Sequence, residues 1–89
     1  PYMPDLAIEV QSPSQSDQHM TDKARYYLEN GSRMVWLIYP HRHLVEILTP
    51  DNRQLLTKDD TIHGGDVLPG FSVPVQDIFP AEPPLEQQA

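Results

Sequence analysis

The sequence predicts a single α/β domain with a mixed β-sheet, one main α-helix and a β-hairpin. Three observations support this fold class. Residues 5–11 alternate between apolar and other side chains, as a half-buried strand does. Between Ser14 and Asn30 the apolar residues recur at helical spacing. Met34–Tyr39 is an unbroken apolar run, and its branched and aromatic residues favour a strand buried on both faces.

The first predicted strand begins at Asp5 and ends before Pro13, because proline cannot donate a hydrogen bond to a sheet. A period of two places Leu6, Ile8 and Val10 on one face, and we expect that face to pack into the core. The opposite face is polar apart from one alanine, and it holds Asp5, Ala7, Glu9 and Gln11.

The helix is predicted to begin between Ser14 and Asp17. It should end at Asn30, because Gly31 can adopt the left-handed conformation that terminates helices. Lys23 lies on the flank of the apolar stripe of this helix and not on its solvent-facing side. The stripe follows the spacing i, i+4, i+7, i+8 and consists of Met20, Ala24, Tyr27 and Leu28.

Turn signals organise the second half of the domain. The strands Leu44–Thr49 and Arg53–Thr57 flank the turn residues Pro50–Asn52 and should form an antiparallel hairpin beside the apolar central strand. Lys58–Asp66 is polar, and we expect a loop with at most one residue pair in the sheet. A helical turn is expected near Gln76–Phe79.

Composition limits the possible classes of protein. The domain is expected to span residues 4–79, and residues 80–89, rich in Pro, Glu and Gln, are expected to be a flexible tail. The net charge of −7 opposes the approach of a polyanion. The chain has no cysteine, which excludes thiolate metal sites and fits a reducing compartment, so we expect a cytoplasmic protein. No apolar run approaches the roughly 20 residues of a membrane-spanning helix, so no membrane partner is expected.

The candidate chemistry lies on the first strand and the helix. Asp5 and Glu9 are four residues apart on a strand, about 13 Å, so they cannot share one metal ion directly. A metal ion bound by Glu9 would need a further acidic ligand from another segment. The alternation and the helical stripe allow Lys23 to reach over the strand to Glu9. They also fit a solvated carboxylate and a surface lysine, which spacing alone favours while leaving both interpretations open.

Four segments resemble the Uma-two family of restriction endonucleases, which belongs to the PD-(D/E)XK nuclease superfamily. They are PDLAIEVQSPS from residue 4, KARYYLENG from residue 23, VWLIYP from residue 35 and VLPGFSVPVQDIF from residue 67. The resemblance covers residues 4–79 with the motifs in the family's order. It implies a restriction-endonuclease-like fold and the hydrolysis of DNA phosphodiester bonds with Mg²⁺ or Mn²⁺ as cofactor.

The resemblance also implies roles for individual residues. Glu9 matches the metal-binding acid of the superfamily motif, and the backbone carbonyl of Val10 would be a further metal ligand. Gln11 stands where the catalytic lysine of the superfamily usually lies. Lys23 matches the position to which this lysine has moved in the family, and Asp5 matches the aspartate of its PD dipeptide. Asp5 and Gln11 would therefore line a site formed by Glu9 and Lys23.

The chain also departs from the family pattern. Tyr39 replaces an aspartate before the proline of the VWLIYP segment, while Tyr27 and Trp36 match recurrent positions that we interpret as structural. Family members are longer, and an earlier acidic strand supplies their other metal-binding aspartate, so this chain corresponds to the C-terminal half of the domain. The alternative function is therefore an inactive remnant that acts as a protein-interaction module. An unpaired sheet edge in so small a domain predicts a homodimer.

Overall fold

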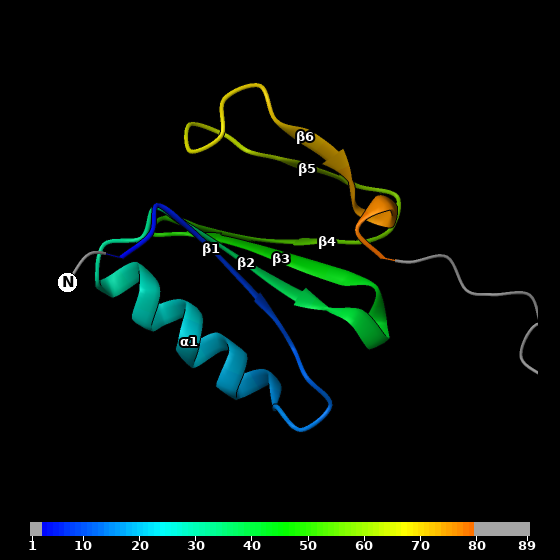
Figure 1. The fold of residues 1–89 in the computed structure, drawn as a ribbon, viewed down its shortest axis with the longest axis horizontal. Coiled ribbons are helices and arrows are strands. Elements are labelled where there is room, and N and C mark those ends of the chain that lie inside the picture. The colour runs from blue at the N-terminus through cyan, green and yellow to red at the C-terminus, as the bar shows by residue number, and fades with distance from the viewer. Residues whose placement is uncertain (1–2, 80–89) are drawn as a thin grey trace, which may run out of the picture.

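The computed structural model describes residues 3–79, which form a four-stranded sheet with a helix on one face and a two-stranded hairpin over the other (Figure 1). The strand order is β1-β2-β3-β4, with β1 and β2 parallel and the remaining pairs antiparallel. This confirms the predicted mixed α/β fold. In chain order the elements are β1 (Leu6–Val10), α1 (Asp17–Glu29), β2 (Met34–Tyr39), β3 (Leu44–Thr49), β4 (Asn52–Leu56), β5 (Thr61–His63) and β6 (Ser72–Pro74), with 3-10 turns at Pro40–Arg42 and Val75–Asp77.

Both ends of α1 agree with the prediction. The helix starts at Asp17, and the Ser16 hydroxyl caps it by accepting a hydrogen bond from the backbone N–H of His19 at 3.0 Å. Asn30 is the C-cap, and Gly31 follows at a φ of 116°, a value that favours glycine. Because both caps are satisfied locally, the sequence alone was sufficient to locate the helix.

The segment after β4 differs from its prediction. The expected loop at 58–66 contains β5, which pairs with β6 over three residues. Ile62 in β5 is fully buried, so a single apolar anchor draws this otherwise polar segment onto the sheet. The expected turn near 76–79 instead begins at Val75, whose side chain is also fully buried. The predicted tail at 80–89 lies outside the described residues.

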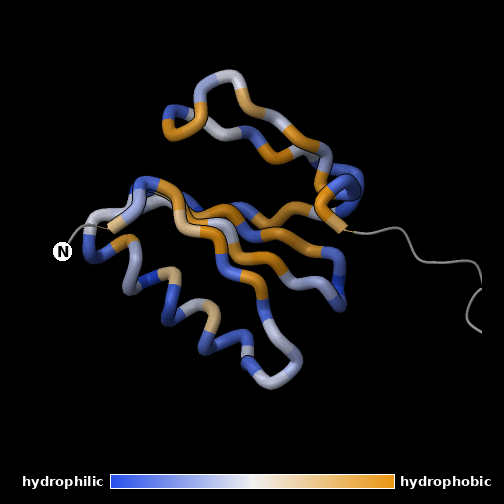
Figure 2. Tube along the Cα trace, viewed as in Figure 1, coloured by the Kyte–Doolittle hydropathy of each residue, from blue (hydrophilic) through white to orange (hydrophobic). Residues whose placement is uncertain are grey.

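The central strand β2 separates two apolar clusters, and all six of its residues are buried, as predicted. Figure 2 shows apolar segments along the strands of the sheet and a largely hydrophilic α1. The cluster on the hairpin side contains Met34, Trp36, Ile38, Val45, Ile47, Leu56, Ile62 and Val75. The cluster on the α1 side contains Ala7, Met20, Ala24, Val35, Leu37, Tyr39 and Leu48, with Tyr27 and Leu28 packed against it.

The face of β1 that packs into the core is the opposite of the predicted one. Ala7 is buried at 6% exposure beneath α1, whereas Ile8 and Val10 are 49% and 54% exposed. The hairpin packs on β2, β3 and β4, so on the other face of β1 only Leu6 contacts the core. The small side chain of Ala7 allows α1 to lie close to the strand. The predicted alternation of the strand is confirmed, but the prediction of which face packs into the core was wrong.

An ion pair joins the start of α1 to the turn that follows β2. Arg42 donates from Nη2 and Nη1 to the two carboxylate oxygens of Asp17, at 2.7 and 3.0 Å. The guanidinium lies over the Tyr39 ring, 4.6 Å from its centroid. Hydrogen bonds from Arg42, and then from Gln11, lower the pKa of the Asp17 carboxyl below its usual value. The carboxyl ends of β1 and β2 are thereby tied to the N-terminus of α1.

This ion pair should make stability depend on pH in the acid range. Because the pKa of Asp17 is lowered on folding, its contribution to stability is present above the ordinary value of 3.8 and is lost as the pH falls below it. The variant Arg42→Gln should unfold at lower urea concentration than the wild type at pH 7. The difference between their midpoints should shrink below pH 3.8, and a difference that stays constant would contradict the assignment.

The orientation of β1 can be tested by two neighbouring substitutions. Ala7→Leu should lower the free energy of unfolding by about 1–3 kcal/mol, because the larger side chain would overpack the space beneath α1. Ile8→Thr should change it by about 0.5 kcal/mol or less, because that side chain is half exposed. Chemical denaturation of both variants measures these values. If Ile8→Thr destabilised the protein more than Ala7→Leu, the core face of β1 would be the one expected from the sequence.

Candidate functional site

Three side chains meet where α1 crosses β1. Lys23 donates from Nζ to Oε2 of Glu9 at 3.1 Å, and Tyr27 donates from its hydroxyl to Oε1 of Glu9 at 2.9 Å. Both carboxylate oxygens of Glu9 are therefore engaged by donors from one helix. The meeting of Glu9 with Lys23, which the sequence allowed but did not require, is thus present in the structure.

Local structure explains why these groups converge. Glu9 shares a face of β1 with Ala7, and this face lies beneath α1. Lys23 and Tyr27 are four residues apart, so they occupy one side of the helix. The side chains of Glu9 and Lys23 are 20% and 34% exposed. The pair is therefore shielded in part from water but remains open to a ligand.

The proximity of Glu9 changes the ionisation of Tyr27. The hydrogen bond to the carboxylate, together with partial burial, raises the pKa of the Tyr27 phenol above its usual value. Tyr27 therefore remains a neutral donor at physiological pH. The family pattern favours a structural role for Tyr27, although its position one helical turn after Lys23 indicates that it can reach the same carboxylate.

Asp5 is not brought to this cluster. It precedes β1 at the end of the strand away from Glu9, and its side chain is exposed. Its backbone carbonyl accepts hydrogen bonds from the N–H groups of Arg33 and Met34, at 2.9 and 3.0 Å. Asp5 therefore anchors the start of the β1–β2 pairing through its backbone. The catalytic role implied by the family resemblance stays a prediction.

Gln11 lies past the end of β1 and is directed towards the start of α1. Its Nε2 donates to the Gln15 carbonyl at 3.0 Å and to Oδ1 of Asp17 at 2.8 Å. The amide therefore stabilises the turn between strand and helix. In the structure Lys23, and not Gln11, contacts Glu9.

The backbone carbonyl of Val10 faces the outer edge of the sheet. In a parallel pair, every second residue of a strand directs its backbone N–H and C=O to the neighbouring strand, and the residues between direct theirs to the opposite side. Gln11 N–H donates to the Ile38 carbonyl at 2.9 Å. The Asp5 carbonyl accepts from Met34. The odd-numbered residues of β1 therefore face β2, so the N–H and C=O of Val10 point to the side on which β1 has no neighbouring strand within residues 3–79.

A pocket of about 330 Å³ adjoins the cluster. Lys23, Tyr27 and His19 are among the residues that line it. Within residues 3–79, no group of three or more His, Asp or Glu side chains is placed so that it could hold a metal ion. Glu9 is thus a single carboxylate whose two donors, Lys23 and Tyr27, line this pocket. The same residues contain no helix long and apolar enough to cross a membrane.

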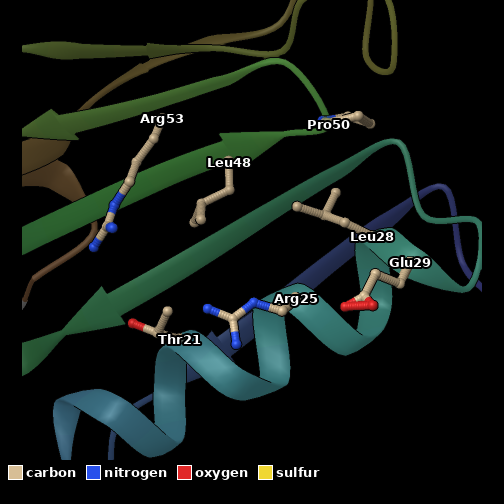
Figure 3. Close-up of a pocket in the computed structure, with 7 residues that line it drawn as sticks. All are labelled: Thr21, Arg25, Leu28, Glu29, Leu48, Pro50 and Arg53. Atoms are coloured by element: carbon tan, nitrogen blue, oxygen red, sulfur yellow. The ribbon is translucent and has the colours of Figure 1, made fainter.

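A second pocket, of about 360 Å³, lies between α1 and the strands β3 and β4 (Figure 3). It is separate from Glu9 and Lys23. Arg53 on its wall forms an ion pair with Glu46, a buried carboxylate of β3. This pair satisfies a charge inside the fold, so the guanidinium has a structural role. The lining residues are Thr21, Arg25, Leu28, Glu29, Leu48, Pro50 and Arg53.

Comparison with known proteins places this chain in a family. The fold is similar to the crystal structure of "a putative nuclease belonging to DUF820" from Anabaena variabilis ATCC 29413, with a TM-score of 0.78 and 26% sequence identity. The match covers 86% of this chain and 44% of the other, so this chain spans less than half the length of that protein. No curated protein matches the chain. The model of the Uma2 family, described as "Putative restriction endonuclease", matches residues 1–76, and the chain therefore belongs to this family.

Proposed function

We propose that this protein hydrolyses DNA phosphodiester bonds with Mg²⁺ or Mn²⁺, using Glu9 as a metal ligand and Lys23 as the catalytic lysine. The observation that carries the proposal is the 3.1 Å contact between Lys23 Nζ and Glu9 Oε2. The contact lies in a chain of the Uma2 family whose fold is similar to that of the protein described as "a putative nuclease belonging to DUF820". A carboxylate with an adjacent ammonium is a suitable arrangement for phosphoryl chemistry.

Oxygen ligands on β1 could fill part of the coordination sphere of a hard divalent cation. Mg²⁺ commonly takes one or two carboxylates and completes its shell with water and substrate phosphate oxygens. Glu9 supplies a carboxylate, and the carbonyl of Val10 is directed to the free edge of the same strand. A bound cation would lower the pKa of a coordinated water and offset phosphate charge. Its further ligands would come from water, DNA or another segment.

Lys23 can act on the substrate while it holds Glu9. Its ammonium has three protons, and its contact with Glu9 uses one of them. The side chain is 34% exposed and lines the adjoining pocket, so the remaining protons are accessible to a phosphate oxygen. As negative charge grows on the phosphoryl group, a fixed positive charge at this position would stabilise the transition state.

DNA as the substrate, a cytoplasmic location and a homodimer complete the proposal. The net charge of −7 opposes DNA binding, so a cation at Glu9 would assist the approach of the phosphate backbone. The alternative of an inactive interaction module has weaker support, because a partly buried carboxylate, a lysine and an open pocket are assembled at one place. Dimerisation and hydrolysis are compatible, because the free edge of β1 can pair with a second copy.

Substitutions at Glu9 and Lys23 should strongly slow hydrolysis. Glu9→Gln and Lys23→Gln should each lower the rate of Mg²⁺- or Mn²⁺-dependent DNA cleavage by about 10²–10³-fold, because the first removes the charge that would hold the metal ion and the second removes the charge that would stabilise the transition state. Glu29→Gln and Lys58→Gln are matched controls at exposed positions, and they should leave the rate unchanged. The measurement is the nicking of plasmid DNA by the whole chain. A cleavage rate that Glu9→Gln leaves unchanged, or no cleavage by the wild type with either metal, would refute the proposal.

The dimer prediction can be tested through backbone chemistry. Ile8→Pro removes an N–H that faces the free edge of β1, so it should shift the protein towards monomer while the pairing with β2 is retained. Sedimentation velocity of the wild type should show two copies. A wild type that sediments as a monomer at all concentrations would contradict edge pairing.

A further inference from the structure

We propose that Tyr27 is a positioning residue of this site: with Lys23, it fixes the plane of the Glu9 carboxylate and so selects the lone pairs that face a divalent cation. This inference rests on the proposed function, since it concerns the same carboxylate. It assigns to Tyr27 a role beyond packing. Its basis is the two hydrogen bonds of 2.9 and 3.1 Å that hold the two oxygens of Glu9 separately.

The geometry of Glu9 explains why a second donor is needed. The terminal torsion of a glutamate side chain is broad, so a carboxylate held at one oxygen can still rotate. Tyr27 holds Oε1 and Lys23 holds Oε2, so the carboxylate can no longer rotate about its terminal torsion and its plane is fixed. An ionised carboxylate offers about four lone-pair sites, so two contacts leave about two free. Those free positions have defined directions only while both donors are in place.

Tyr27 is the more rigid of the two donors. Its ring packs against the apolar cluster beneath α1 and stands edge-on to Tyr26, with ring centroids 6.3 Å apart. A tyrosine has only two main side-chain torsions, whereas the ammonium of Lys23 sits on a flexible four-carbon stem. The hydroxyl position is therefore set by core packing. Tyr27 provides direction, and Lys23 provides charge.

The neutrality of Tyr27 suits this division of roles. A second cation on Glu9 would compete with a metal ion for the same negative charge, whereas a phenol donates a hydrogen bond and leaves the net charge in place. Hydrogen bonds that orient a ligating side chain commonly affect metal affinity by about 10–100-fold. We therefore expect Tyr27 to act on the affinity for the metal more than on the chemical step.

The variant Tyr27→Phe tests the inference, because it removes the hydroxyl and retains the packed ring. Tyr26→Phe is the matched control, since it deletes the same group from the neighbouring residue, which is 59% exposed. Without metal or DNA, a double-variant cycle of Glu9→Gln and Tyr27→Phe should show non-additive effects on the denaturation midpoint. The corresponding cycle with Tyr26→Phe should be additive. Additivity for Tyr27 would show that it does not hold Glu9 and would overturn the inference.

The second measurement is Mn²⁺ binding by calorimetry in the absence of DNA. Tyr27→Phe should raise the Kd for Mn²⁺ by about 10–100-fold while the protein remains folded at the assay temperature, and Tyr26→Phe should leave the Kd unchanged. In cleavage assays the concentration of Mn²⁺ at half-maximal rate should rise likewise, with the rate at saturating Mn²⁺ restored to within a few-fold. An unchanged Kd would overturn the inference.

The two arms separate this inference from the proposed function. If the wild type binds Mn²⁺ and cleaves DNA while Tyr27→Phe behaves as Tyr26→Phe does, only the role of Tyr27 fails. If the wild type neither binds Mn²⁺ nor cleaves DNA, the proposed function fails, and the metal-directed part of this inference fails with it. The stability cycle still decides whether Tyr27 holds Glu9, because it requires neither metal nor DNA.

Discussion

The burial of β2 on both faces is the constraint on which the rest of the structure depends. Such a strand needs a layer on each side, and α1 and the β5–β6 hairpin provide them (Figure 1). Its parallel partner β1 adds a second requirement, because parallel strands cannot be joined by a tight turn. The two strands must be joined by a crossover connection that runs over one face of the sheet, and here that connection contains α1. The helix therefore lies over Glu9 as a consequence of topology.

Packing and chemistry share the same helix. Met20 and Ala24 bury one side of α1 against the sheet, and Lys23 and Tyr27 extend from the flank of that side to Glu9. The closeness of the helix depends on a small residue, Ala7, at the point of contact. The position of the carboxylate and its two donors is thus determined by core packing. Side chains carried by a packed strand and helix are held more precisely than side chains on a loop.

Local signals were enough for most of the fold. The caps of α1, the apolar run of β2 and the turn between β3 and β4 were each read from neighbouring residues, and each is confirmed. Prediction failed where the outcome depends on distant segments. The strand β5 needs β6 as a partner, and the core face of β1 depends on which layer covers it. The hydrogen bond from Tyr27 to Glu9 was not predicted, because the direction of the hydroxyl depends on a strand 18 residues away in the sequence.

The sequence by itself determined the periodicities of β1 and α1, the positions of Glu9 and Lys23 on them, and the motifs that identify the family. Those properties depend on residues close together in the chain. Only the tertiary structure decided that Glu9 faces α1, that Tyr27 joins Lys23 on its carboxylate, and that the Gln11 amide bonds to the start of α1. The physical reason is that either face of an alternating strand can pack into a core. The layer that covers the strand in the folded protein decides which face is buried.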